Sequence, residues 1–75
     1  MMQPWQRNVL INKYIADSKL YELNEMIDSN RFDENQKQLM QEEANNLESY
    51  IEICTKRLEG VDPVDIARVY DEWSR

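Results

Sequence analysis

The sequence predicts an all-α protein, in which two long helices form an antiparallel hairpin and a short third helix follows. Three observations predict this fold. The 75 residues include one glycine and two prolines, which leaves few residues suited to turns. Apolar residues recur at alternating steps of four and three over most of the chain. Turn-forming residues gather near 28–33 and 60–62, so we expect three helices in one domain spanning residues 1–75.

The first helix is expected over residues 4–28. Pro4 is tolerated in the first turn of a helix, and no helix-breaking cluster follows before Asp28. Within this helix one row of residues keeps the 4–3 spacing of a helix-packing seam, and Lys13 is its only polar member. The row consists of Val9, Lys13, Ala16, Leu20, Leu23 and Ile27.

The second helix is expected over residues 34–59. Asp33 and Gln36 have the spacing of an N-terminal capping box, and Gly60 stands where a left-handed C-terminal cap is usual. The matching seam consists of Met40, Ala44, Leu47, Ile51, Cys54 and Leu58. If the chain folds back at residues 28–33, the two seams meet and small residues face large ones.

The third helix is expected over residues 63–74. Asp62 is a good N-cap and Pro63 suits the first helical position. Its apolar stripe is Ile66, Val69, Tyr70 and Trp73. A helix this short is unstable in isolation, so it needs a surface on which to dock.

The first helix carries further apolar residues outside its seam. Leu10, Tyr14 and Tyr21 fall on one flank, whereas Ile11, Ile15 and Met26 fall on another. Either the third helix or a second copy of the chain could cover them. Because a short chain buries only about 60% of its unfolded surface, we expect a homo-oligomer. The residues predicted to form the oligomer or partner interface are Trp5, Leu10, Ile11, Tyr14, Ile15, Tyr21, Val69, Tyr70 and Trp73.

A polar group at the hairpin seam permits two interpretations. In the first, Lys13 fixes the register of the two helices and pairs with Asp17, four residues on. In the second, cationic and aromatic side chains form a site for an anionic ligand such as a nucleotide, and Arg7 could extend it; in an oligomer the ligand would lie between Arg7, Lys13, Tyr14 and Arg57. The candidate ligand residues are Arg7, Lys13, Tyr50 and Arg57.

Composition excludes several classes of function. Without histidine and with one cysteine, the chain cannot form a zinc finger or a Ser/His or Cys/His nucleophile pair, and we expect no enzyme, cofactor or metal site. A net charge of −6 with no basic face disfavours binding to the DNA or RNA backbone. No apolar run could span a bilayer and no signal peptide is recognised, so a cytoplasmic protein is expected.

Over residues 5–58 the sequence resembles short helical-hairpin proteins of tailed phages and prophages. The residues that carry the resemblance are Val9, Leu10, Lys13, Asp17, Lys19, Leu20, Leu23, Met26, Ile27, Gln36, Leu39, Leu47, Tyr50, Arg57 and Leu58. The resemblance implies a phage-encoded protein directed against a host process such as immune defence. We therefore expect an inhibitor that contacts a host protein. The alternatives are an oligomeric sponge for an anionic nucleotide signal and a structural or assembly protein of the virion.

Overall fold

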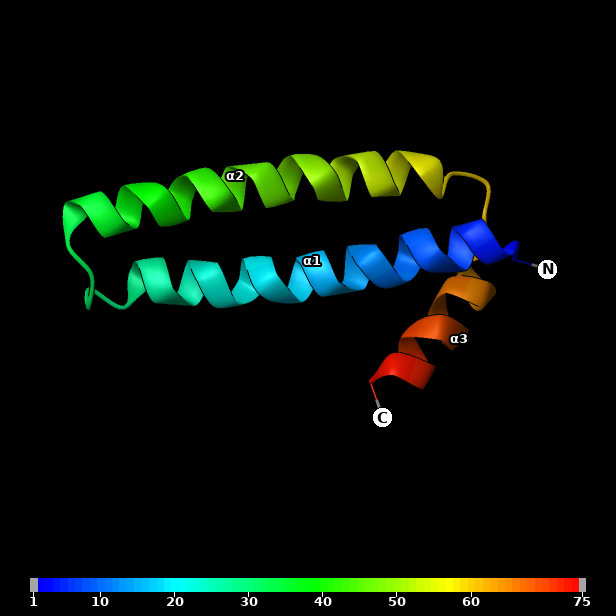
Figure 1. Cartoon of the computed structure of the whole chain (residues 1–75). Coiled ribbons are helices and arrows are strands. Elements are labelled where there is room, and N and C mark those ends of the chain that lie inside the picture. Colours follow the sequence, from blue (N-terminus) through cyan, green and yellow to red (C-terminus); the bar gives the residue numbers. More distant parts are fainter. Residues whose placement is uncertain (1, 75) are drawn as a thin grey trace.

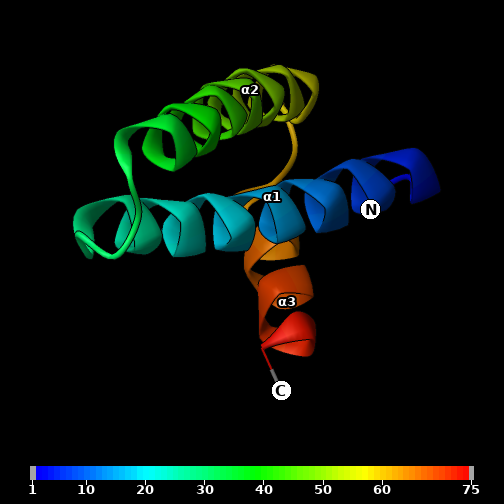
Figure 2. The ribbon, with the colours of Figure 1, turned by 60° about the vertical axis from the view of Figure 1, so that its left-hand side comes forward.

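A computed structural model describes residues 2–74 of the chain, and these residues are all-helical apart from their turns and caps. The three helices are α1 (Pro4–Asp28), α2 (Glu34–Arg57) and α3 (Pro63–Trp73). Helices α1 and α2 run antiparallel, and α3 packs against α1 on the side away from α2 (Figure 1, Figure 2). The predicted hairpin with a short third helix is confirmed for the described residues. Within residues 2–74, no helix is long and apolar enough to cross a membrane.

Local side-chain hydrogen bonds fix where the helices begin. The Asp33 carboxylate accepts from the Gln36 backbone N–H at 2.8 Å, and the Gln36 side chain accepts from the Asp33 N–H at 3.1 Å. These two bonds confirm the predicted capping box of α2. The Asp62 carboxylate accepts from the backbone N–H of Val64 at 2.9 Å, which caps α3 before Pro63.

The ends of the helices differ slightly from the predicted ones. Helix α2 ends at Arg57 and not at residue 59. There the backbone tightens into the i to i−3 hydrogen bonds of a 3₁₀ turn, such as that from the Glu59 N–H to the Lys56 carbonyl at 3.3 Å. The chain then turns at Gly60, whose φ of 87° lies in the left-handed region as predicted. Helix α3 ends at Trp73, and Ser74 caps it through its N–H to the Tyr70 carbonyl.

Both predicted seams lie at the contact between α1 and α2. Every seam residue is buried or half-buried, including the half-buried Lys13 at its edge. The most deeply buried ones are Ala16, Leu23, Ala44, Cys54 and Leu58. Small residues at these levels allow the two helices to approach closely.

The hydrophobic core extends beyond the hairpin at the end where α1 begins. Leu10, Leu58 and Val69 form one buried cluster, to which α1, the turn after α2 and α3 each contribute one residue. Leu10 is completely buried. The sequence allowed either the third helix or a second copy of the chain to cover the flank of α1 that carries Leu10. In the structure α3 of the same chain covers it.

Candidate functional site

An aromatic cluster lies between α1 and α3. The ring of Tyr14 on α1 lies 5.5 Å from that of Tyr70 and 6.4 Å from that of Trp73, both on α3, measured between centroids. Tilted pairs at these distances are favourable aromatic contacts. Tyr14 and Tyr70 are half-buried, whereas Trp73 remains 44% exposed. We call these three residues the aromatic surface.

Lys13 holds the polar edge of the aromatic surface. Its ammonium donates to the Asp17 carboxylate at 3.0 Å and to the Tyr70 hydroxyl at 3.5 Å, which joins α1 to α3. Partial burial alone would lower the pKa of Lys13, but the hydrogen bond to Asp17 and the neighbouring Tyr70 outweigh burial and raise it above 10.5. The pairing of Lys13 with Asp17 agrees with the first interpretation of the sequence.

An open groove of about 670 Å³ runs beside the aromatic surface. The residues that line it are Lys13, Tyr14, Asp17, Ser18, Ala67, Tyr70, Asp71 and Ser74. A second hollow of about 510 Å³ shares Asp17 and Ser18 with it and continues along α1 past Tyr21, Glu22 and Glu25. Carboxylates outnumber cations along this path, and the one lysine already bonds to Asp17. The groove therefore combines an apolar aromatic wall with an acidic rim.

The predicted interface residues do not form one surface. Leu10 and Val69 are core residues of this chain, so their assignment to an interface is wrong. Ile11 is half-buried against the same core. Tyr14, Tyr70 and Trp73 do come together, and Tyr21 lies along the adjoining hollow at 66% exposure. The other two residues, Trp5 and Ile15, are exposed but line neither hollow.

The predicted anionic-ligand residues are not assembled into a site. Arg7 forms an ion pair with Glu72 on α3 at 2.7 Å, and Lys13 bonds to Asp17. Tyr50 lies beside Asn12, Cys54 and Arg57, so it does not join Lys13. Its pKa is raised, mainly because its hydroxyl bonds to the Cys54 side chain and is partly desolvated. Of the four residues only Tyr50 and Arg57 thus lie near each other, and two of the three cations already have carboxylate partners.

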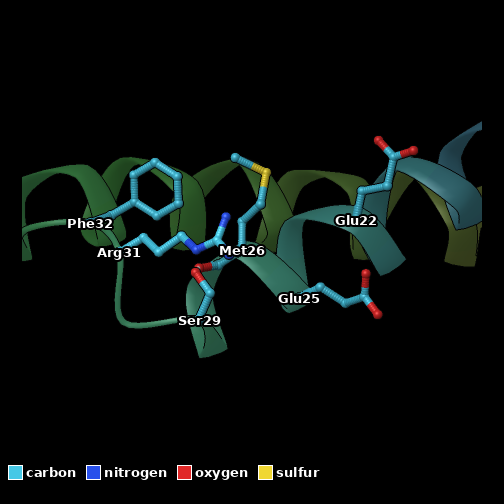
Figure 3. A pocket seen from close by; sticks show the side chains of 6 residues that line it. All are labelled: Glu22, Glu25, Met26, Ser29, Arg31 and Phe32. Carbon is cyan, nitrogen blue, oxygen red and sulfur yellow. The ribbon is translucent and has the colours of Figure 1, made fainter.

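A further hollow of about 540 Å³ opens at the hairpin turn (Figure 3). It is lined by Glu22, Glu25, Met26, Ser29, Arg31 and Phe32. Two carboxylates share this hollow with Arg31, which makes it unfavourable for an anion. Among the described residues, no group of three or more Asp, Glu or Cys side chains is placed to hold a metal ion.

One exposed surface was not recognised in the sequence. On the flank of each hairpin helix next to its seam, a second row repeats the 4–3 spacing. In α1 the row is Trp5, Asn8, Asn12, Ile15, Lys19, Glu22 and Met26, and in α2 it is Leu39, Glu43, Asn46, Tyr50, Ile53 and Arg57. All these residues are exposed. We call the two rows the open face. In the sequence it could have been found as a row of residues with the 4–3 spacing, each one position before a seam residue.

Comparisons with known proteins give no family for the chain. No protein-family model matches it, and neither a curated protein nor a solved structure shows significant similarity to it. The functional proposals below therefore depend on the geometry of the chain itself and on the resemblance of residues 5–58 stated above.

Proposed function

We propose that the chain is a non-enzymatic, phage-encoded inhibitor that binds a host protein through its aromatic surface. The observation that carries this proposal is the aromatic surface itself, where Tyr14 contacts both Tyr70 and Trp73, Trp73 stays 44% exposed, and Tyr14 and Tyr70 line an open groove. Tryptophan and tyrosine dominate the energetic centres of protein interfaces, especially where they adjoin a groove. The phage origin rests on the resemblance of residues 5–58.

The chemistry of the groove defines the partner. Asp17 lines the groove, Glu22 and Glu25 line the hollow that adjoins it, and the whole chain carries a net charge of −6. Such a surface favours a segment that offers apolar anchors together with lysine or arginine, as a basic amphipathic helix does. We infer that the host partner presents a segment of this kind.

The test compares capture of host proteins by matched variants of α3. The full chain is immobilised, incubated with bacterial lysate, and its bound proteins are identified by mass spectrometry. Trp73→Ala removes the exposed anchor, so we expect at least about a tenfold loss of the specific partner. Val64→Ala also removes an exposed apolar side chain of α3, 62% exposed, but one that is not part of the aromatic surface, whereas Trp73 contacts the Tyr14 ring, so capture should be unchanged.

Salt and nucleotides sharpen this test. Because an acidic rim attracts a basic segment through screened charges, capture should weaken between low and high salt. A panel of nucleotides should leave the Tm of the chain unchanged, whereas a tight nucleotide ligand would raise it by several degrees. Equal capture by Trp73→Ala and the wild type would reject the proposal, and a nucleotide-dependent rise in Tm would favour the sponge hypothesis instead.

A further inference from the structure

The open face holds most of the exposed apolar side chains of the molecule. Among the described residues, nine large apolar side chains are exposed, and six of them lie on the open face. These six are Trp5, Ile15, Met26, Leu39, Tyr50 and Ile53. Helix α3 covers a different side of α1, that of Leu10 and Tyr14, and leaves the open face uncovered. The apolar residues are therefore concentrated on one side of the hairpin.

The spacing of the open face is that of a helix-packing surface. Both rows follow the same alternating steps of four and three as the buried seams, over almost the whole length of α1 and α2. Each row precedes its seam by one residue, and in an antiparallel pair of helices this offset falls on the same side of both helices, so the two rows lie side by side. Two adjacent rows with this spacing can receive the ridges of two further helices, as in a four-helix bundle.

The chain by itself exposes more surface than a compact protein of its mass. Its accessible surface is 5761 Å², whereas a compact monomer of this size exposes about 4,900 Å². Its radius of gyration is 14.8 Å, against about 11 Å for a compact chain of this length. The excess surface, roughly 900 Å², is close to the ~800 Å² that each partner buries in a standard interface. One further interface of ordinary size would therefore bring the chain to the usual degree of burial.

We propose that the open face binds the open face of a second copy of this chain, which creates an antiparallel four-helix bundle. The charges on the face select the second copy as occupant. The whole chain has a net charge of −6, but the open face is balanced, with Lys19 and Arg57 against Glu22 and Glu43. Two copies can therefore meet here without the repulsion that opposes contact elsewhere.

The order of these charges also fixes the symmetry. Glu43 precedes Tyr50 by seven residues and Arg57 follows it by seven, so a twofold axis across the helices at Tyr50 places Arg57 of each copy opposite Glu43 of the other. A twofold axis parallel to the helices would instead set Glu22 opposite Glu43, two like charges. The axis across the helices is thus the favoured arrangement.

Sedimentation equilibrium of the full chain tests this interface. We expect a species of twice the 9.1 kDa chain mass at tens of micromolar. Glu43→Arg and Arg57→Glu, each alone, place two like-charged pairs across the interface and should weaken the dimer at least about tenfold. The double variant exchanges the charges and should recover most of the wild-type affinity. Glu48→Arg makes the same change of charge on the opposite flank of α2 and should not weaken the dimer.

Three outcomes would overturn the inference. The first is a mass of 9.1 kDa at all concentrations up to the solubility limit. The second is a dimer that the double variant does not restore although its circular dichroism shows an intact fold. The third is a dimer that Trp73→Ala dissociates but Glu43→Arg does not, since this would place the interface on the aromatic surface. The residues tested are distinct from those of the proposed host-protein surface, so the two proposals can fail separately.

Discussion

Helix α1 has two apolar sides outside the hairpin seam, and they end in different environments. On one side Leu10 is completely buried by Leu58 and Val69, and the Tyr14 ring packs against Tyr70 of α3. On the other side Ile15 remains 49% exposed on the open face. Side chains of similar hydrophobicity thus become a core residue or a surface residue according to where α3 docks. In this small chain a single short helix decides which apolar side is stabilised within the molecule.

The largest expected effect tests the covered side. Leu10→Ala removes a fully buried side chain and leaves a cavity between three parts of the chain, so the free energy of unfolding should fall by about 3 kcal/mol. Urea denaturation followed by circular dichroism measures the loss. Val64→Ala, at a position that is 62% exposed, is the control and should cost less than about 1 kcal/mol. Equal effects of the two substitutions would mean that α3 does not cover Leu10 in solution.

A smaller loss of stability is expected when the N-cap of α3 is removed and the core residues are left unchanged. Asp62→Ala removes the carboxylate that accepts from the Val64 N–H at 2.9 Å, so the free energy of unfolding should fall by about 1 kcal/mol. Asp62→Asn retains a capping acceptor and should stay close to the wild type. Hydrogen exchange should locate the loss in α3, and uniform acceleration of exchange in α1 and α2 would contradict this.

A smaller effect is expected on the open face. At a concentration where sedimentation gives a monomer, Ile53→Ser should change the free energy of unfolding by less than about 0.5 kcal/mol, because this side chain is 55% exposed. The matched change at the covered side, Leu58→Ser, should cost several times more because Leu58 is buried. A large loss for Ile53→Ser in the monomer would show that the open face is covered within the chain.

The smallest expected effect concerns pH and the contact of Lys13 with Tyr70. The pKa of Lys13 is raised in the folded chain, so its stabilising contribution is complete below the ordinary value of 10.5 and is lost as the pH rises through the folded value. Stability measured by thermal denaturation should therefore begin to fall above about pH 10.

The variant Lys13→Met isolates this contribution. The pKa values of the Tyr21 and Tyr50 hydroxyls are also raised, beside the Glu25 carboxylate and the Cys54 side chain respectively, and they produce a fall of the same sign. Lys13→Met should make the alkaline fall shallower without removing it. An equal slope in the variant would show that the ammonium contributes nothing to holding α3 on α1.

The sequence predicted the elements well because each was specified locally. The capping box of Asp33 and Gln36, the left-handed Gly60 and the N-cap Asp62 depend on residues within one turn of each other. The two seams could also be predicted from the sequence. Their 4–3 spacing determines which faces of the two helices meet in an antiparallel hairpin. Helix α2 ends two residues earlier than predicted because its final turn tightens, and α3 ends one residue earlier than predicted.

The candidate sites were harder to predict because they depend on the path of α3. Arg7 and Lys13 looked available to an anionic ligand, but α3 brings Glu72 to the first, and Asp17 and Tyr70 bond to the second. Leu10 and Val69 looked like interface residues, but they pack in the same buried cluster of the core. Local spacing indicated the pairing of Lys13 with Asp17, but it could not foresee those of Arg7 with Glu72 and of Lys13 with Tyr70, since these partners lie more than fifty residues apart in sequence.

The sequence by itself determined that this protein is helical, where its helices begin and which faces of the first two meet. These properties follow from hydrogen bonds and side-chain periodicity over distances of one or two helical turns. Only the tertiary structure decided that α3 covers the Leu10 flank of α1 and leaves the open face exposed. Both flanks of α1 are apolar enough to accept α3, and the direction of the turn between Arg57 and Pro63 brings α3 to one of them.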